Sequence, residues 1–346
     1  MITIGVDAHK RTHTMVAIDS IGAPISEVTV SAVPTGHAQA LRWAVELGDP
    51  DLVWAVEDSR LYTRLLEHEL LSAHQRVVRV PTVMMAHTRK SARTWGKSDP
   101  IDATAVARAA LREPGLPVAF HDIPSWELKL LVDRRDDLVA QRVAVTNRLS
   151  QRLHLIDPTA KHPKNLGRIV QREALDDYLA GLPGLCCELA REELSDVERF
   201  SRNIDALTHR IGARVREMGS SLPEIPGCGE LTAARFISEA ANVTRFRNES
   251  AFARYVGVAP QPEWSGSTRG RLRLSRSGNR QLNSALHTIA MVQLRLDGPG
   301  RAYYQRRIES GDTRAGARRC LKRRICRVVF NRLLADYRAT HCAVPR

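Results

Sequence analysis

The sequence predicts a mixed α/β domain at the N-terminus, followed by a longer region built mainly of helices. Short runs in which apolar residues alternate, as they do in strands, are concentrated in residues 1–81. Two stretches between residues 131 and 218 instead repeat apolar residues every three, four or seven positions, as amphipathic helices do. At 346 residues the chain also exceeds the size that one hydrophobic core usually serves, so we expect two or three domains.

The composition argues against a disordered chain and against a membrane protein. Hydrophobic residues make up 43% of the chain and charged residues 26%, which is typical of a globular protein. No run approaches the roughly 20 apolar residues that a membrane-spanning helix needs, so we expect a cytoplasmic protein with no membrane partner. The six cysteines show no C-x-x-C spacing, which argues against a zinc ribbon or a redox pair and favours reduced thiols.

Residues 1–120 are expected to form the α/β domain. Apolar runs at residues 2–6, 15–18 and 25–30 predict three antiparallel strands joined by turns. The elements expected next are a helix at 36–47, a strand at 51–57, a helix at 61–73, a strand at 76–81 and a helix at 99–111. This order fits a ribonuclease H-like domain better than a doubly wound nucleotide-binding fold, which would begin with strand, helix, strand.

Residues 121–220 are expected to form a helical arm. Apolar residues recur at spacings of seven, four and three between Leu131 and Ile156, and at three and four between Leu194 and Met218. Each stretch therefore carries a narrow apolar stripe between charged faces, which is typical of a helical hairpin or an α-helical coiled coil. We expect an extended coiled-coil arm that also serves dimerisation; a compact bundle packed on its own domain is the alternative.

Residues 221–346 are expected to form a mainly α C-terminal domain. The segment IPGCG at residues 225–229, followed by a helix at 231–240, resembles a helix-hairpin-helix element. The glycine-rich turn of such an element offers backbone N–H groups to a DNA phosphate, so Gly227 and Gly229 are candidate nucleic-acid-binding residues. An ordinary turn between two helices is the alternative. A polar, glycine-rich loop is expected at residues 261–278.

The net charge of +14 lies entirely in the last part of the chain. Residues 263–346 hold 19 Lys and Arg against 5 Asp and Glu, whereas residues 1–262 hold 33 of each. Arginine, whose planar guanidinium suits phosphate, supplies most of the positive charge, and this clustering predicts a nucleic acid as partner. The candidate phosphate-binding residues are Arg269, Arg271, Arg273, Arg276, Arg318, Arg319, Lys322, Arg323, Arg324 and Arg327.

Four carboxylates stand where a ribonuclease H-like fold would gather them. Asp7 closes the first strand, Glu57 closes the strand that ends at residue 57, and Asp99 and Asp102 lie three apart on one helix face. Carboxylate oxygens of this kind hold Mg²⁺ or Mn²⁺, and two such ions clamp the attacking and leaving oxygens of a phosphodiester. We therefore expect all four to be metal ligands, although Asp99 can also be explained as a helix cap.

Motifs in both halves of the chain resemble the insertion-sequence one-ten family of transposases. In the first half the DEDD signature of that family corresponds to GVDAHK at 5–10, VEDS at 56–59 and KSDPIDA at 97–103. In the second half, successive blocks of its C-terminal domain correspond to IPG at 225–227, YVGVAP at 255–260, WSG at 264–266 and SRSGN at 275–279. The motifs occur in the order found in the family, and the similarity covers nearly the whole chain.

The resemblance implies a RuvC-like domain joined through a coiled coil to a transposase domain. It also implies a serine nucleophile, which falls on Ser265, and a non-coding bridge RNA that pairs with both donor and target DNA. Ser267 stands where relatives often have a second glycine, so the choice between the two hydroxyls stays open. A composite site made by two domains, expected across subunits, implies a homo-oligomer, either a dimer or a tetramer.

The sequence therefore predicts an RNA-guided recombinase that cuts and rejoins DNA to move its own insertion sequence, in the cytoplasm of a prokaryotic cell and at the nucleoid while active. One alternative is a RuvC-like structure-specific endonuclease that uses metal and water, in which Ser265 is only structural. The other is a DNA-inversion or accessory protein that binds nucleic acid without cutting it.

Overall fold

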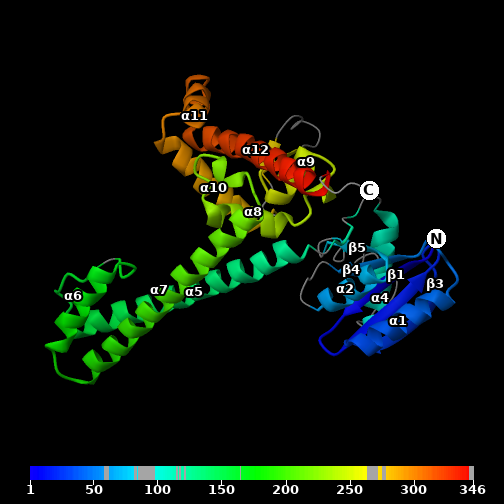
Figure 1. Cartoon of the computed structure of the whole chain (residues 1–346), viewed down its shortest axis with the longest axis horizontal. Coiled ribbons are helices and arrows are strands. Elements are labelled where there is room, and N and C mark those ends of the chain that lie inside the picture. The colour runs from blue at the N-terminus through cyan, green and yellow to red at the C-terminus, as the bar shows by residue number, and fades with distance from the viewer. Residues whose placement is uncertain are drawn as a thin grey trace. The chain divides into compact units, whose positions relative to one another are not determined.

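The computed structural model describes residues 1–57, 62–81, 84, 98–113, 116, 118–120, 122–163, 165–262, 272–274 and 278–342. The chain divides into two compact units, Met1–His121 and Asp122–Arg346 (Figure 1). The division into three domains at residues 120 and 220 stays a prediction.

The first unit is built on a mixed five-stranded sheet in the order β3-β2-β1-β4-β5. Strands β1 (Thr3–Ala8), β2 (Thr12–Ile18) and β3 (Pro24–Ser31) form the expected antiparallel meander. Strands β4 (Val53–Glu57) and β5 (Arg76–Val80) continue the sheet, each parallel to its neighbour. Over the described residues the order of strands and helices is the predicted one, so the mixed α/β class is confirmed.

Three helices cover the two faces of this sheet. Helices α1 (Pro34–Glu46) and α2 (Arg64–Ser72) pack on one face, where Ile4 and Val6 of β1 enter the core. Helix α4 (Asp99–Arg112) packs on the opposite face through small residues such as Ala103 and Ala107. Since Gly5 of β1 has no side chain, the backbone of α4 lies directly against this strand. The N-terminus of α4 is thereby held close to β1.

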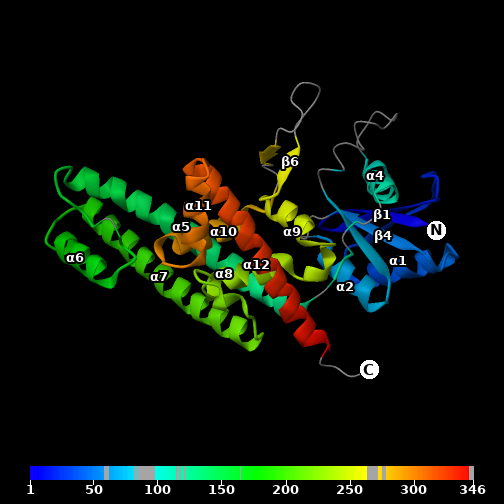
Figure 2. The ribbon, with the colours of Figure 1, turned by 90° about the horizontal axis from the view of Figure 1, so that it is seen from above.

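Two long helices of the second unit form the predicted helical hairpin. Helices α5 (Ile123–Ile156) and α7 (Leu185–Glu217) run antiparallel, and the shorter α6 (Ile169–Ala180) packs at their far end (Figure 2). The apolar stripe lies between them, where Leu138 packs with residues 204 and 207 and Leu149 with residues 194 and 197. The pairing of this hairpin with a second copy as a coiled coil stays a prediction.

The rest of the second unit is mainly helical, as expected. It contains the short helix η1 (Leu222–Glu224), α8 (Glu230–Ala240), η2 (Val243–Arg245), α9 (Glu249–Val256), α10 (Arg280–Arg295), α11 (Pro299–Glu309) and α12 (Arg314–Cys342). Their shared core is filled by Phe236, Phe252 and Leu286, and it also takes in Leu128 of α5. No helix among the described residues has both the length and the apolar character needed to cross a membrane.

The expected loop at residues 261–278 differs from the structure at its edges. Strands β6 (Pro260–Pro262) and β7 (Leu272–Leu274) pair antiparallel, with Pro262 opposite Leu272. Residues 263–271 therefore connect two paired strands. Strands of three residues are too short to show the alternation from which strands are recognised in a sequence, which explains the miss.

Candidate active site

Asp7 and Glu57 are brought together by strand register. β1 and β4 are parallel, and Val6 lies opposite Val56, so Asp7 and Glu57, the next residues of the two strands, lie side by side in the sheet. Val6 and Val56 both enter the core under α1 and α2, and alternation along a strand sends the next residues to the other face. Asp7 and Glu57 thus lie on the face that α4 covers.

Asp99 and Asp102 lie in the first turn of α4, above the same edge of the sheet. Ser98 occupies the N-cap position, so Asp99 is the first residue of the helix rather than its cap. The amide of Asp102 donates to the carbonyl of Ser98 at 3.1 Å, which is the first hydrogen bond of the helix. Asp99 is 53% exposed, whereas Asp102 is only 6% exposed.

The electrostatics of Asp7 show that the four acids form one cluster. Burial raises the pKa of the Asp7 carboxyl group above its ordinary value, while the nearby imidazole of His9 opposes this shift. The three other carboxylates raise the same pKa further, in the order Asp102, Asp99 and Glu57. The structure therefore brings together all four acids that the sequence analysis selected, although they come from positions up to 95 residues apart.

The donor set fits a divalent cation. The Asp7 side chain is 13% exposed, and its buried Oδ2 atom accepts no hydrogen bond from any residue that the structure describes. A buried carboxylate oxygen without a donor, surrounded by like charges, is costly unless a cation neutralises it. Oxygen ligands in this number suit a hard divalent ion.

His9 belongs to this cluster and was not assigned a role from the sequence. Its Nδ1 lies 3.7 Å from Asp7 Oδ2, and its Nε2 lies 4.0 Å from Asp99 Oδ1. One ligand atom from each of these three residues falls within 4.8 Å of the others, so the three together can hold a metal ion. The spacing of two residues between Asp7 and His9 is the signal that was available, because it places both on one side of an extended chain.

The serine candidates, Ser265 and Ser267, lie outside the described residues, as do Arg269, Arg271 and Arg276. The base of their loop is described and is closely packed. An added Cβ on Gly278 would lie 2.2 Å from the Cα of Gly257, so the entering and leaving chains touch there. The amide of Asn279 donates to the carbonyl of Tyr255 at 2.7 Å, and the Asn283 side chain donates to two carbonyls of the entering chain. Arg273 lies in β7, opposite Gln261.

The basic candidates on α12 do not form one free surface. The guanidinium groups of Arg323 and Arg327 pair with Glu249 of α9, and the ammonium of Lys322 donates to Asn283 of α10. Arg324 stacks over the ring of Tyr303, with its Cζ atom 4.8 Å from the ring centroid. These four side chains thus hold α12 to its neighbours.

Arg318 and Arg319 form no ion pair among the residues that the structure describes. Arg319 is exposed and Arg318 is partly exposed. They lie one turn before the four side chains that pack against neighbouring helices. A role in nucleic-acid binding stays a prediction for all six basic candidates on α12.

The two glycines of the predicted hairpin element differ in environment. Gly227 has a φ of 88°, and an added Cβ would lie 2.9 Å from Val292 Cβ on α10. This glycine is explained by packing of the turn against α10, which is the ordinary-turn alternative. Gly229 is the N-cap of α8, and an added Cβ there would meet no described atom within 4 Å. Nucleic-acid binding by Gly227 and Gly229 stays a prediction.

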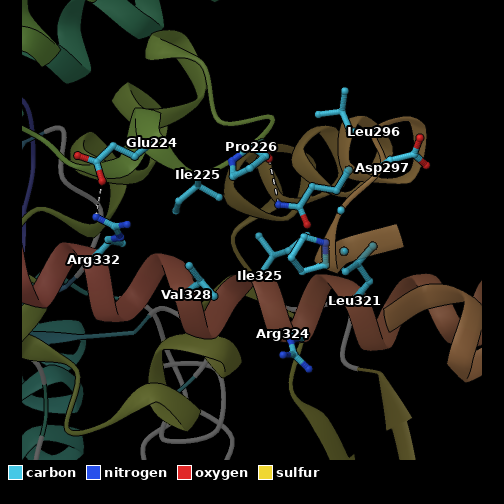
Figure 3. Close-up of a pocket in the computed structure, with 14 residues that line it drawn as sticks. Glu224, Ile225, Pro226, Leu296, Asp297, Leu321, Arg324, Ile325, Val328 and Arg332 are labelled. Atoms are coloured by element: carbon cyan, nitrogen blue, oxygen red, sulfur yellow. Dashed lines mark hydrogen bonds and ion pairs between the residues drawn. The ribbon is translucent and has the colours of Figure 1, made fainter. Parts of the chain in front are cut away.

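A separate pocket of about 500 Å³ lies between the turn before α8, the end of α10 and the middle of α12 (Figure 3). Its lining is mostly apolar and includes Ile225, Leu296, Leu321, Ile325 and Val328. The Arg332 guanidinium donates to Glu224 at 2.6 Å, and the Gln293 amide donates to the carbonyl of Pro226 at 3.0 Å. Since these polar groups pair with one another, the pocket does not present a cluster of catalytic groups.

Two protein families match the chain, the first over the first unit and the long helix α5 and the second over the later part of the second unit. Residues 4–158 match a family described as "Transposase", and residues 219–305 match the family described as "Transposase IS116/IS110/IS902 family".

Individual relatives extend the similarity over nearly the whole chain. The uncharacterised 44.8 kDa protein of insertion element IS116 from Streptomyces clavuligerus is 27% identical, over 99% of this chain and 97% of that protein. The uncharacterised 42 kDa protein of insertion element IS900 from Mycobacterium paratuberculosis is 25% identical, over 98% and 97%. The transposase for insertion sequence element IS1111A of Coxiella burnetii is 26% identical, over 58% of this chain and 55% of its own length. Together with the acid cluster, these matches show that the chain belongs to the IS110/IS116/IS902 family of transposases and is a DNA-processing enzyme.

Proposed function

We propose that the chain cuts and rejoins DNA as an RNA-guided recombinase, using a metal-bound acid cluster in its first unit and a serine of its second. The observation that carries the proposal is the convergence on Asp7 of three further carboxylates, all of which raise its pKa. Carboxylates gathered in this way repel one another unless cations neutralise them. Paired divalent ions would neutralise them and would also bind the oxygens of a phosphodiester.

We infer that the first unit is a ribonuclease H-like, RuvC-like domain. Its sheet order, with two antiparallel pairs followed by two parallel ones, supports this reading, as does the placement of the acids at the ends of adjacent parallel strands. Asp7, Glu57, Asp99 and Asp102 would hold Mg²⁺ or Mn²⁺. When bound, the ions would polarise the scissile phosphate and stabilise the charge that develops on its oxygens.

The residues of the chain divide the remaining tasks. His9, 51% exposed beside Asp7 and Asp99, would orient these two carboxylates. The hydroxyl of Ser265 would attack phosphorus as the bond to a DNA oxygen breaks, and that oxygen leaves with a proton. The phosphodiester is thereby kept as a serine ester, and the reverse reaction with a second DNA end rejoins the strand.

Nucleic-acid binding is assigned to the basic part of the second unit. The charge surplus after residue 262 supports contacts with DNA and RNA backbones, and Arg318 and Arg319 offer guanidinium groups that no described carboxylate neutralises. Guidance by a bridge RNA is consistent with a protein that binds the charged backbone of nucleic acids while base pairing of the RNA recognises the DNA sequence. A homo-oligomer, either a dimer or a tetramer, would carry out the reaction. Such a protein would act on chromosomal DNA in the cytoplasm.

The experiment that tests the proposal follows covalent protein–DNA adducts on denaturing gels. Wild type is incubated with labelled DNA spanning the ends of the element, RNA transcribed from its flanking non-coding sequence, and Mg²⁺. We expect an adduct in wild type, none in Ser265→Ala, a weakened one in Ser267→Ala, and neither adduct nor cleavage in Asp102→Asn.

The alternatives give different results in the same gel. A RuvC-like endonuclease that uses water would cut without any adduct and would keep cutting as Ser265→Ala. An accessory protein would bind without cutting in every variant. An adduct lost only in Ser267→Ala would move the nucleophile by two residues.

A further inference from the structure

A buried polar network lies where the serine-bearing loop returns to the fold. The carboxylate of Glu239, on α8, is 7% exposed and is the centre of this network. Its Oε1 atom lies 2.8 Å from the ammonium nitrogen of Lys129 on α5, and its Oε2 atom accepts a hydrogen bond of 2.6 Å from the side-chain amide of Asn279. Asn279 is the N-cap of α10, the helix that follows β7.

Asn279 uses its side chain and its backbone amide to join three helices, α8, α9 and α10. Its Oδ1 atom caps α10 by accepting from the amide of Leu282 at 3.0 Å. Its Nδ2 atom donates to Glu239 and lies 3.4 Å from the hydroxyl oxygen of Tyr255 on α9. The backbone amide of Asn279 donates to the backbone carbonyl of Tyr255. The leaving end of the loop is thus tied to α8 and α9 at the point where α10 begins.

The charge of Glu239 is balanced from α5. Burial by itself would lower the pKa of Lys129, but hydrogen bonds to Asp133 and Glu239 outweigh this effect and raise it, so the ammonium is charged at neutral pH. The Nζ atom lies 2.5 Å from Asp133 Oδ1. An ionised Glu239 is the form that accepts from both Lys129 and Asn279, since a carboxylate only accepts hydrogen bonds.

Capping of α10 requires only the Oδ1 atom of Asn279. The contacts of its Nδ2 atom with Glu239 and Tyr255 go beyond that task. The N-caps Asn242 and Asn248 serve η2 and α9 in this same unit through their own Oδ1 atoms, and neither donates to a buried carboxylate among the described residues. The additional bonds of Asn279 fix the end of the loop in position and direction. Strands β6 and β7, which lie on either side of residues 263–271 in the sequence, are paired with each other.

We propose that Glu239 and Asn279, supported by Lys129, are positioning residues that fix the serine-bearing loop for attack on DNA. The inference rests on the proposed serine function of that loop. It assigns to a buried carboxylate of the second unit a role separate from the metal-binding acids of the first. Misplacement of a nucleophile by about 1 Å slows a reaction by on the order of 10²-fold, which gives such a network its importance.

The test uses a reciprocal pair of substitutions in the full chain. Asn279→Asp keeps the helix cap but faces Glu239 with a second carboxylate. Glu239→Gln combined with Asn279→Asp restores one hydrogen bond, now donated by the glutamine. The matched control is Asn248→Asp, the same change at the N-cap of α9. Adduct formation with the labelled DNA and RNA is measured at saturating DNA, and the dissociation constant of DNA is measured separately.

We expect Asn279→Asp to slow adduct formation about tenfold or more while DNA affinity stays within about twofold. The double variant should recover most of the rate, and Asn248→Asp should match wild type. A wild-type rate in Asn279→Asp, or a double variant as slow as the single one, would overturn the inference.

Failure of the serine function itself is recognised by the absence of any adduct in wild type. The network is then judged by hydrogen exchange at the Asn279 amide, which donates to Tyr255. Protection that is lost in Asn279→Asp and regained in the double variant supports the positioning role. Protection unchanged in Asn279→Asp overturns it.

Discussion

Replacement of Gly5 by alanine tests whether close packing of α4 on β1 assembles the acid cluster. An added Cβ on Gly5 would lie 2.0 Å from the carbonyl oxygen of Ala103, 2.6 Å from the amide nitrogen of Ala107 and 2.8 Å from its Cβ. The two nearest atoms belong to the helix backbone, which cannot turn aside as a side chain can. Helix and strand must therefore separate by about 1 Å, since interiors are close-packed.

The expected cost has a structural and a catalytic part. Overpacking of this kind destabilises a domain by about 1–3 kcal/mol, so the melting temperature of the first unit should fall by several degrees. Asp99 and Asp102 move with α4 while Asp7 stays on β1. A shift of about 1 Å between the ligands should lower metal-dependent cleavage by on the order of 10²-fold in protein that is still folded.

The assay combines thermal unfolding with the cleavage rate at saturating Mg²⁺. Gly181→Ala is the matched control, because an added Cβ there would meet only the Tyr178 carbonyl oxygen, at 3.7 Å. Gly5→Ala combined with Ala107→Gly should not recover activity, since it removes only the third of the three close contacts. Normal cleavage by folded Gly5→Ala, or recovery in the double variant, would refute the reasoning.

Three further predictions concern charge. Asp7→Asn should raise the melting temperature measured without divalent cations, because it removes a buried charge whose pKa is raised by burial and by its acidic neighbours, and Mg²⁺ should no longer stabilise the variant. The pKa of His13 is lowered from 6.5 to about 4 by burial and by His37, so as the pH falls the unfolded chain binds this proton before the folded one does. The free energy of unfolding should therefore fall by up to about 3 kcal/mol between pH 6.5 and pH 4. Urea unfolding of His13→Gln should lack this pH-dependent loss. Arg318→Ala and Arg319→Ala should each reduce the slope of log K against log salt for nucleic-acid binding by about 1, and an unchanged slope would remove them from the interface.

The element order of the first unit could be read from the sequence because each element is a local pattern. The alternation in β1 to β3 and the stripe between α5 and α7 depend only on residues a few positions apart, and both are present in the structure. The four acids could be selected for the same reason, since a residue at the end of a strand or in the first turn of a helix is recognised from its neighbours. The pairing of β6 with β7 could not, because three residues carry no period.

What the tertiary structure alone decided is which charged groups meet. Strand and helix positions identified Asp7 and Asp99, but only the structure shows that the imidazole of His9 lies close to both carboxylates. The basic candidates on α12 were selected as phosphate-binding residues, yet Arg323 and Arg327 pair with Glu249, which lies more than 70 residues earlier in the chain. The contact of Glu239 with Lys129 and Asn279 likewise joins residues far apart along the chain. The physical reason is that the energy of an ion pair depends on distance in space and on burial, and neither quantity is encoded in the local spacing of residues.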